Sequence, residues 1–230
     1  MDLWERVDDL AQPPRVALSS TRIALAGIEI ADAEGLDAVS MRKVAMRLNA
    51  GTMSLYRYVT SRDDLIALMI DQVYSTFSAA PRSVDWRRDL ADAARGIRAV
   101  TLKHPWLAGR SVARLGLGPN LLRMLESTLA LVDGYGMSVD EMLDVLGTIQ
   151  SFVQGYVLEE ATEQDAWRIT KLTKSEAQQQ QESRVRKIME SGRYPQVTRV
   201  VTGSADNPDP HTVFERRLRY VLDGLATAFQ

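Results

Sequence analysis

The sequence predicts an all-α protein in which a small N-terminal three-helix domain precedes a larger helical domain. Apolar residues recur at spacings of three and four, and helix-cap residues stand at the ends of those segments. No segment alternates as a clear strand does; the short stretch 197–201 is the single strand candidate. We expect a leader over residues 1–19, a helix-turn-helix domain over 20–62 and a second domain over 63–230.

The first domain and its connection are predicted from these spacings and caps. Gly35 stands where the C-cap of the first helix is expected. Ser61 and Asp64 have the spacing of a capping box and open a helix that connects the two domains. The expected helices cover about 20–35, 40–48, 52–58 and, for the connecting helix, 61–78.

The second domain is also predicted to be helical throughout. Ser138 and Glu141 form another capping-box pattern, which opens the longest and most apolar segment. Its apolar positions include Leu143, Leu146 and Ile149. The expected helices cover about 85–103, 105–113, 119–134, 138–168, 173–191 and 211–229.

Composition excludes several functional classes. The 230 residues contain no cysteine and two histidines, His104 and His211, so thiolate chemistry and a histidine-rich metal centre are excluded. No apolar run approaches the roughly 20 residues that span a bilayer, and the charged N-terminus lacks a signal-peptide core. We expect a cytoplasmic protein with no membrane partner.

The charge of the chain is unevenly distributed. The net charge is −2, yet the stretch 40–62 contains no acidic residue. Its five basic residues are Arg42, Lys43, Arg47, Arg57 and Arg62. Since binding to an anionic partner depends on the local field, this stretch is the candidate for nucleic-acid binding.

Two short helices separated by Asn49-Ala50-Gly51 indicate a helix-turn-helix. The expected inner face is Met41, Val44, Ala45, Leu48, Leu55 and Val59. The expected outer face of the second short helix is Thr52, Met53, Ser54, Tyr56, Arg57 and Tyr58. Arginine can bind guanine edges in the major groove, whereas Arg42, Lys43 and Arg62 suit phosphates. By spacing and charge alone, a solvated helical hairpin with a chance basic surplus explains the stretch equally well.

A family resemblance decides between these alternatives. Residues 20–77 resemble the DNA-binding domain of the TetR family. The segments that carry the resemblance are Ile30-Ala31-Asp32-Ala33-Glu34-Gly35, Val39 to Leu48, Ser54-Leu55-Tyr56-Arg57-Tyr58-Val59 and Arg62-Asp63-Asp64-Leu65. The resemblance implies that Arg42 contacts a base edge and Arg62 a phosphate. Most relatives have glycine at position 49, and asparagine tolerates the left-handed conformation that this turn needs.

The resemblance continues into the second domain, in the tetracycline-repressor branch of the family. It is carried by His104-Pro105-Trp106, Gly118-Pro119-Asn120, residues 121–135, residues 155–160 and residues 214–229. It implies a homodimer joined by a four-helix bundle of the 138–158 helix and the last helix. The apolar positions of 138–158, together with Leu218, Val221, Leu222, Leu225 and Phe229, suit that interface or, alternatively, fill the core of one chain.

The resemblance also implies a small-molecule effector whose identity the sequence does not reveal. Candidate contacts are Trp106, Arg110, Leu122, Leu125, Phe152, Tyr156 and Glu159. Each aromatic residue alternatively belongs to the core, with Trp106 a packing anchor. Glu159 matches a glutamate near the magnesium–drug site of that branch, but one carboxylate does not supply a divalent-ion site. Glu159 is equally suited to an interface, and we expect no metal or cofactor.

We therefore expect a ligand-responsive repressor that leaves a palindromic operator when its effector binds. An enzyme is disfavoured because the chain has neither a nucleophile–base pair nor a glycine-rich phosphate loop. A ligand-binding or partner-binding module without a specific DNA target is the remaining alternative.

Overall fold

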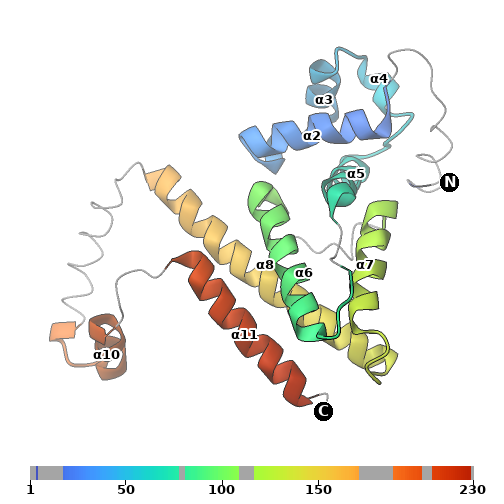
Figure 1. Ribbon diagram of the computed structural model, residues 1–230. Coiled ribbons are helices and arrows are strands. Elements are labelled where there is room, and N and C mark those ends of the chain that lie inside the picture. The colour runs from blue at the N-terminus through green and yellow to red at the C-terminus, as the bar shows by residue number, and fades with distance from the viewer. Residues whose placement is uncertain are drawn as a thin grey trace. The chain divides into compact units, whose positions relative to one another are not determined.

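The computed structural model describes Trp4 and residues 18–77, 81–108, 117–170, 189–203 and 209–228, with side chains in the long helix described as far as Ala161. Within these residues all regular structure is helical (Figure 1), so the predicted fold class is confirmed. The chain forms two compact units, 1–158 with 221–230, and 159–220. The predicted division between residues 62 and 63 stays a prediction.

The N-terminal head consists of α2 (Ser20–Glu34), the 3₁₀ turn η1 (Leu36–Ala38), α3 (Met41–Arg47) and α4 (Thr52–Leu55). Ser19 caps α2 and Ser40 caps α3, since each hydroxyl accepts a backbone N–H of the first turn. Gly35 ends α2 with a φ of 85°, as predicted. Of the expected inner face, Leu48 is half-buried and the other five side chains are buried.

Helix α5 (Arg62–Val73) connects the head with the rest of the first unit and continues as the 3₁₀ turn η2 (Tyr74–Thr76) (Figure 1). It packs against α2 on one side and α7 on the other. The predicted cap is modified, because Ser61 Oγ accepts Asp64 N–H while the Asp64 carboxylate accepts from the backbone and hydroxyl of Thr60. Every residue from Leu65 to Asp71 is buried, so α5 is a core helix.

The remainder of the first unit is built on α6 (Trp86–Lys103), η3 (Pro105–Leu107), α7 (Pro119–Val132) and the beginning of α8 (Val139–Thr170). The predicted capping box at Ser138 is confirmed, since Ser138 and Glu141 each accept the other's backbone N–H. The backbone N–H and the hydroxyl of Ser138 both donate to the Glu141 carboxylate, and these two hydrogen bonds lower the pKa of Glu141. Hydrophobic side chains from α6, α7 and α8, including Leu90, Leu121 and Val153, complete the core.

The second unit contains α10 (Pro195–Gly203) and most of α11 (Pro210–Ala228), which ends in the first unit. The strand candidate at 197–201 is wrong, because these residues lie in α10. Asp209 caps α11 by accepting the N–H and hydroxyl of Thr212, which lowers its pKa. The expected helix over 173–191 lies almost wholly outside the described residues.

Candidate functional site

The turn between α3 and α4 gives the head its helix-turn-helix geometry. Asn49 has a φ of 51°, the only positive value outside glycine in the described chain. This confirms the prediction that asparagine takes the left-handed conformation here. Its neighbour Ala50 donates its N–H to Ala45 O, which closes the end of α3. The turn orients α4 so that Leu55 is buried while Met53 stays 78% exposed.

Two unpaired arginines lie on the outer surface of the head. Arg42 in α3 and Arg57, just after α4, are both exposed. Among the described residues, no hydrogen bond or ion pair occupies either guanidinium group. Tyr56, 43% exposed, lies next to Arg57. These side chains form a surface with cationic, apolar and aromatic groups free to contact an anionic partner.

The other basic side chains of this stretch have intramolecular partners. Lys43 pairs with Glu34, and Arg47 pairs with Glu29 at 2.7 Å. Arg62 donates to the carbonyl oxygens of Leu36 at 2.9 Å and Val39 at 3.2 Å. Arg62 therefore holds the end of η1, a role that the charge pattern alone did not predict.

Tyr58 does not belong to the outer surface, and its predicted position there is wrong. Its side chain is only 9% exposed, and its hydroxyl donates to Leu18 O at 2.5 Å. The prediction extended α4 to residue 58, whereas the helix ends at Leu55 and a turn follows. Tyr58 lies three residues after the buried Leu55, and this spacing already places it on the inner side with Leu55. Thr52 and Ser54 are half-buried in α4.

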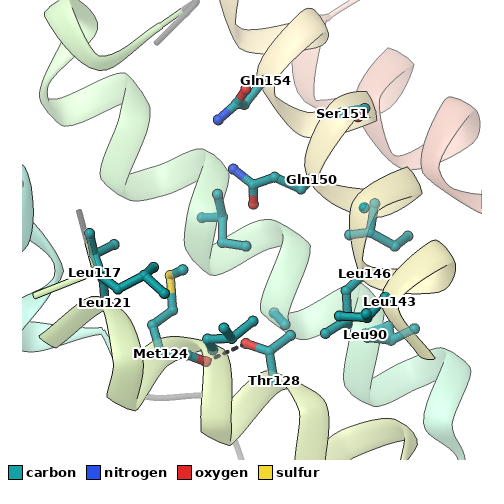
Figure 2. A pocket seen from close by; sticks show the side chains of 15 residues that line it. Leu90, Leu117, Leu121, Met124, Thr128, Leu143, Leu146, Gln150, Ser151 and Gln154 are labelled. Atoms are coloured by element: carbon teal, nitrogen blue, oxygen red, sulfur yellow. Dashed lines mark hydrogen bonds between the residues drawn. The ribbon is translucent and has the colours of Figure 1, made fainter. Parts of the chain in front are cut away.

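A cavity of about 430 Å³ lies among α6, α7 and α8 in the first unit (Figure 2). Leucine, isoleucine, alanine and methionine side chains form most of its wall. The lining residues are Leu90, Ala93, Ile97, Leu117, Leu121, Met124, Leu125, Thr128, Leu143, Leu146, Gly147, Ile149, Gln150, Ser151 and Gln154. A concave apolar site with a few polar groups is typical of small-molecule binding.

One of the predicted ligand contacts, Leu125, lines this cavity. Arg110 lies outside the described residues. Leu122, Phe152, Tyr156 and Glu159 are not among the lining residues, so their roles stay predictions. Their surroundings are specific: Leu122 is 48% exposed, Tyr156 is buried beside Phe152, and Glu159 pairs with Arg217 at 3.0 Å within the second unit. Sequence analysis missed the two glutamines of the wall.

Trp106 contacts the head instead of the cavity. Its indole Nε1 donates to Asp32 Oδ1 at 2.7 Å, and His104 Nδ1 lies 2.9 Å from the same oxygen. His104 is buried, and Asp32 belongs to α2. The residues that follow α6 therefore contact the head through the Asp32 carboxylate. This contact agrees with the alternative that Trp106 is a packing anchor.

A second set of hydrogen bonds links α5 to α7, which forms part of the cavity wall. Asp71 is 3% exposed, and its carboxylate accepts the backbone N–H groups of Asn120 and Leu121, each at 3.0 Å, and Asn120 Nδ2 at 2.8 Å. Asp71 thus caps α7 from a different helix. Burial raises the pKa of Asp71, and these hydrogen bonds oppose the rise. Leu121, directly beside this cap, lines the cavity.

The apolar positions predicted for the dimer interface divide between the core of one chain and its exposed surface, and the interface stays a prediction. Ile149, Val153 and Val157 are buried within one chain, as are Leu218 and Leu222 of α11. Val221 and Leu225 are half-buried, and Phe229 lies outside the described residues. The exposed residues of α8 include Leu143, Gly147 and Ser151, which line the cavity, and Thr148, Gly155 and Leu158, which do not. A Cβ added at Gly147, Gly155 or Gly224 would meet no atom within 4 Å.

The described residues contain no cluster of three or more histidine or acidic side chains that could hold a metal ion. None of the described helices is long and apolar enough to cross a bilayer.

Known proteins share this architecture and sequence. The family "Tetracyclin repressor-like, C-terminal domain" matches residues 79–229. The chain belongs to the TetR family. The transcriptional repressor DrrR1 of Streptomyces coeruleorubidus is 35% identical over 97% of this chain and 83% of its own length. The class E tetracycline repressor of Escherichia coli is 30% identical over 62% of this chain and 69% of its own length.

A solved TetR-family structure extends the likeness to three dimensions. ActR of Streptomyces coelicolor, in complex with actinorhodin, has a TM-score of 0.73 and 26% identity, and the match covers 93% of this chain and 99% of ActR. The chain is therefore a ligand-responsive, DNA-binding transcriptional repressor and not an enzyme.

Proposed function

We propose that this TetR-family repressor binds a palindromic operator as a homodimer through the outer surface of its heads, and that a small organic molecule in the α6–α7–α8 cavity releases it. The observation that carries the proposal is a pair of exposed arginines on a helix-turn-helix, Arg42 and Arg57, whose guanidinium groups have no partner within the described residues. Since a regulator of transcription must reach the chromosome, we place it in the cytoplasm.

The side chains proposed to contact DNA differ in their expected roles. Arg57, Tyr56 and Met53 project around α4, the helix suited to the major groove, where arginine distinguishes guanine and apolar groups contact the thymine methyl. Arg42 suits a base edge or phosphate from α3. Lys43 and Arg62 reach a phosphate only by sharing or exchanging their present partners. Thr52 and Ser54 supply hydroxyl groups at the beginning of α4.

Gly155 on the exposed side of α8 supports the homodimer. Glycine inside a helix costs about 1 kcal/mol relative to alanine, and a Cβ added at Gly155 would meet no other element of the chain within 4 Å. Close packing of a second copy against Gly155 and its exposed neighbour Thr148 explains this glycine. The two heads of such a dimer would meet half-sites about 34–36 Å apart on one face of the DNA.

Release requires that the cavity and the head move together. Asp71 joins the cavity wall at α7 to α5, and Asp32 joins α2 to the end of α6. A ligand that favours a different α6–α7 arrangement therefore shifts both attachments of the head. The shift in DNA affinity cannot exceed the ligand's difference in affinity for the two states. The ActR complex with actinorhodin supports an organic ligand for this family's fold.

The test is fluorescence anisotropy with a duplex from upstream of the chain's own gene. We expect Arg57→Ala to weaken binding by about 5- to 150-fold, as for loss of a base contact, and Tyr56→Ala plus Arg57→Ala to abolish specificity. Arg88→Ala, which removes an exposed arginine on α6, is the matched control. Equal binding by the double variant and the wild type would refute the assigned surface.

The dimer is tested by sedimentation velocity. Gly155→Trp should produce monomers, whereas Val84→Trp adds the same side chain at a 97% exposed loop position and should leave the dimer intact. A monomeric wild type, or a dimeric Gly155→Trp variant, would contradict the proposed interface.

A further inference from the structure

The described part of the cavity wall is uncharged. None of its fifteen described lining residues is acidic or basic. An ionised group brought into such a wall loses its hydration without gaining a counter-charge, which is costly. The wall therefore favours a neutral occupant whose surface is mostly apolar.

The polar groups of the wall are concentrated on α8. Leu143, Gly147, Gln150 and Gln154 recur at spacings of three and four and so share one side of that helix. Figure 2 shows both glutamine side chains extending from α8 toward the interior of the cavity. On α7, the Thr128 hydroxyl donates to Met124 O at 2.7 Å, so its proton is already used. The remaining polar side chains of the described wall are Gln150, Ser151 and Gln154, and the two carboxamides are those that carry both donors and an acceptor. Gln154 already has an interaction within the chain.

Two carboxamides one turn apart provide a defined recognition pattern. Each carries an N–H donor pair and a carbonyl acceptor, and residues four apart on a helix have Cβ atoms about 5–6 Å apart. Gln150 has no hydrogen-bond partner among the described residues. A ligand edge with two hydroxyl or carbonyl oxygens at that spacing can pair with both, while its apolar body contacts Leu121, Leu125 and Leu146.

We infer that the effector is an uncharged, largely apolar molecule with an edge of neutral oxygen groups, and that Gln150 and Gln154 determine its selection. The inference rests on the proposed ligand function of this cavity and names the chemical class of the ligand. Gln150 and Gln154 are the specificity-determining residues, and among the described lining residues no cation is present to pair with an anionic ligand.

The experiment measures probe binding to the full-length protein without DNA. Three probes share one tricyclic size: 1,4-dihydroxyanthraquinone, which is neutral and oxygen-edged; its 2-sulfonate, which is anionic; and anthracene, which has no oxygen. Equilibrium dialysis gives their dissociation constants. We expect the neutral dihydroxyanthraquinone to bind at least about 20-fold more tightly than the sulfonate, because the wall has no charge to compensate it.

Substitutions in the cavity wall test whether Gln150 and Gln154 determine which ligand binds. Gln150→Leu and Gln154→Leu should each weaken dihydroxyanthraquinone binding by about 3- to 10-fold, the cost of one hydrogen bond, and leave anthracene binding unchanged or tighter. Met124→Trp, which fills the cavity from a half-buried position, should abolish binding of both. Gln196→Leu makes the same exchange on exposed α10 and should change nothing. Circular dichroism checks that each variant is folded.

Three results would each overturn the inference: a sulfonate that binds as tightly as its parent, a parent that does not bind, or leucine variants that weaken all probes equally. Operator binding is measured separately by anisotropy. Loss of operator binding with probe discrimination intact would count against the proposed repressor surface alone, so the two failures are distinguishable.

Discussion

The cap that Asp71 places on α7 should be one of the largest single contributions to stability in the first unit. Asp71→Ala removes the acceptor for two backbone N–H groups and one side-chain amide. Each buried donor left without a partner costs about 1–3 kcal/mol. The Asn120 side chain can turn toward solvent, since Asn120 is half-buried, whereas the two backbone groups cannot.

Relief of the buried charge partly offsets this loss. Burial raises the pKa of Asp71, which shows that its ionised form is disfavoured in the interior. We therefore expect Asp71→Ala to lower the free energy of unfolding by about 3 kcal/mol. Asp71→Asn keeps one carbonyl acceptor and removes the charge, so its expected loss is about 1 kcal/mol.

Urea unfolding followed by circular dichroism measures both variants, at a fixed protomer concentration because dimerisation would add to stability. Asp63→Ala, an exposed acidic residue of the same helix, is the control, with an expected change within about 1 kcal/mol. A loss below about 1 kcal/mol for Asp71→Ala, or equal losses for alanine and asparagine, would refute the assignment of Asp71 as the cap.

Three further predictions follow from the head and the core. Tyr58→Phe should lower the free energy of unfolding by about 0.5–1.5 kcal/mol, because it removes the hydrogen bond to Leu18 O. Since Tyr58 is buried, this variant should leave unchanged the slope of log affinity for operator DNA against log salt concentration. Arg57→Ala should reduce that slope if Arg57 also neutralises a phosphate. Asn49→Ala should cost about 1 kcal/mol at a φ of 51° and Asn49→Gly should be neutral or stabilising by thermal unfolding; equal effects would contradict the left-handed turn. Burial raises the pKa of Tyr74, so above a pH of about 10 this tyrosine ionises in the unfolded chain before it ionises in the folded one. The free energy of unfolding of the wild type should therefore fall by up to about 1.4 kcal/mol per pH unit until the folded pKa is reached. Tyr74→Phe should remove this part of the loss at alkaline pH, and parallel curves of unfolding free energy against pH for the two proteins would disprove it.

The structure of the head could be predicted from the sequence because it depends on residues that act close to their own positions in the chain. Ser40, Asn49 and Gly35 act within one or two turns of their own positions, through caps and backbone conformations that a residue type favours. The error at Tyr58 was avoidable from the same local information. Tyr58 follows the buried Leu55 by three residues, a spacing that places two side chains on one side of a helix, and the structure buries both.

The cavity and its attachments could not be predicted in this way. Asp71 and Asn120 are 49 positions apart, and nothing local indicates that one caps the helix of the other. An aspartate among the apolar residues of α5 was a signal, since a buried carboxylate requires donors. Gln150 and Gln154 resembled ordinary polar positions of an amphipathic helix until α6 and α7 enclosed them.

The hydrogen bond between Trp106 and Asp32 makes tryptophan fluorescence useful for following this protein. The indole of Trp106 donates to a carboxylate of the head and lies 6.1 Å from the His104 ring. Indole emission responds to such neighbours, so detachment of the head changes the optical signal of one of only four tryptophans. The release proposed above would change this contact, so rapid-mixing fluorescence of Trp106 can time it without any added dye.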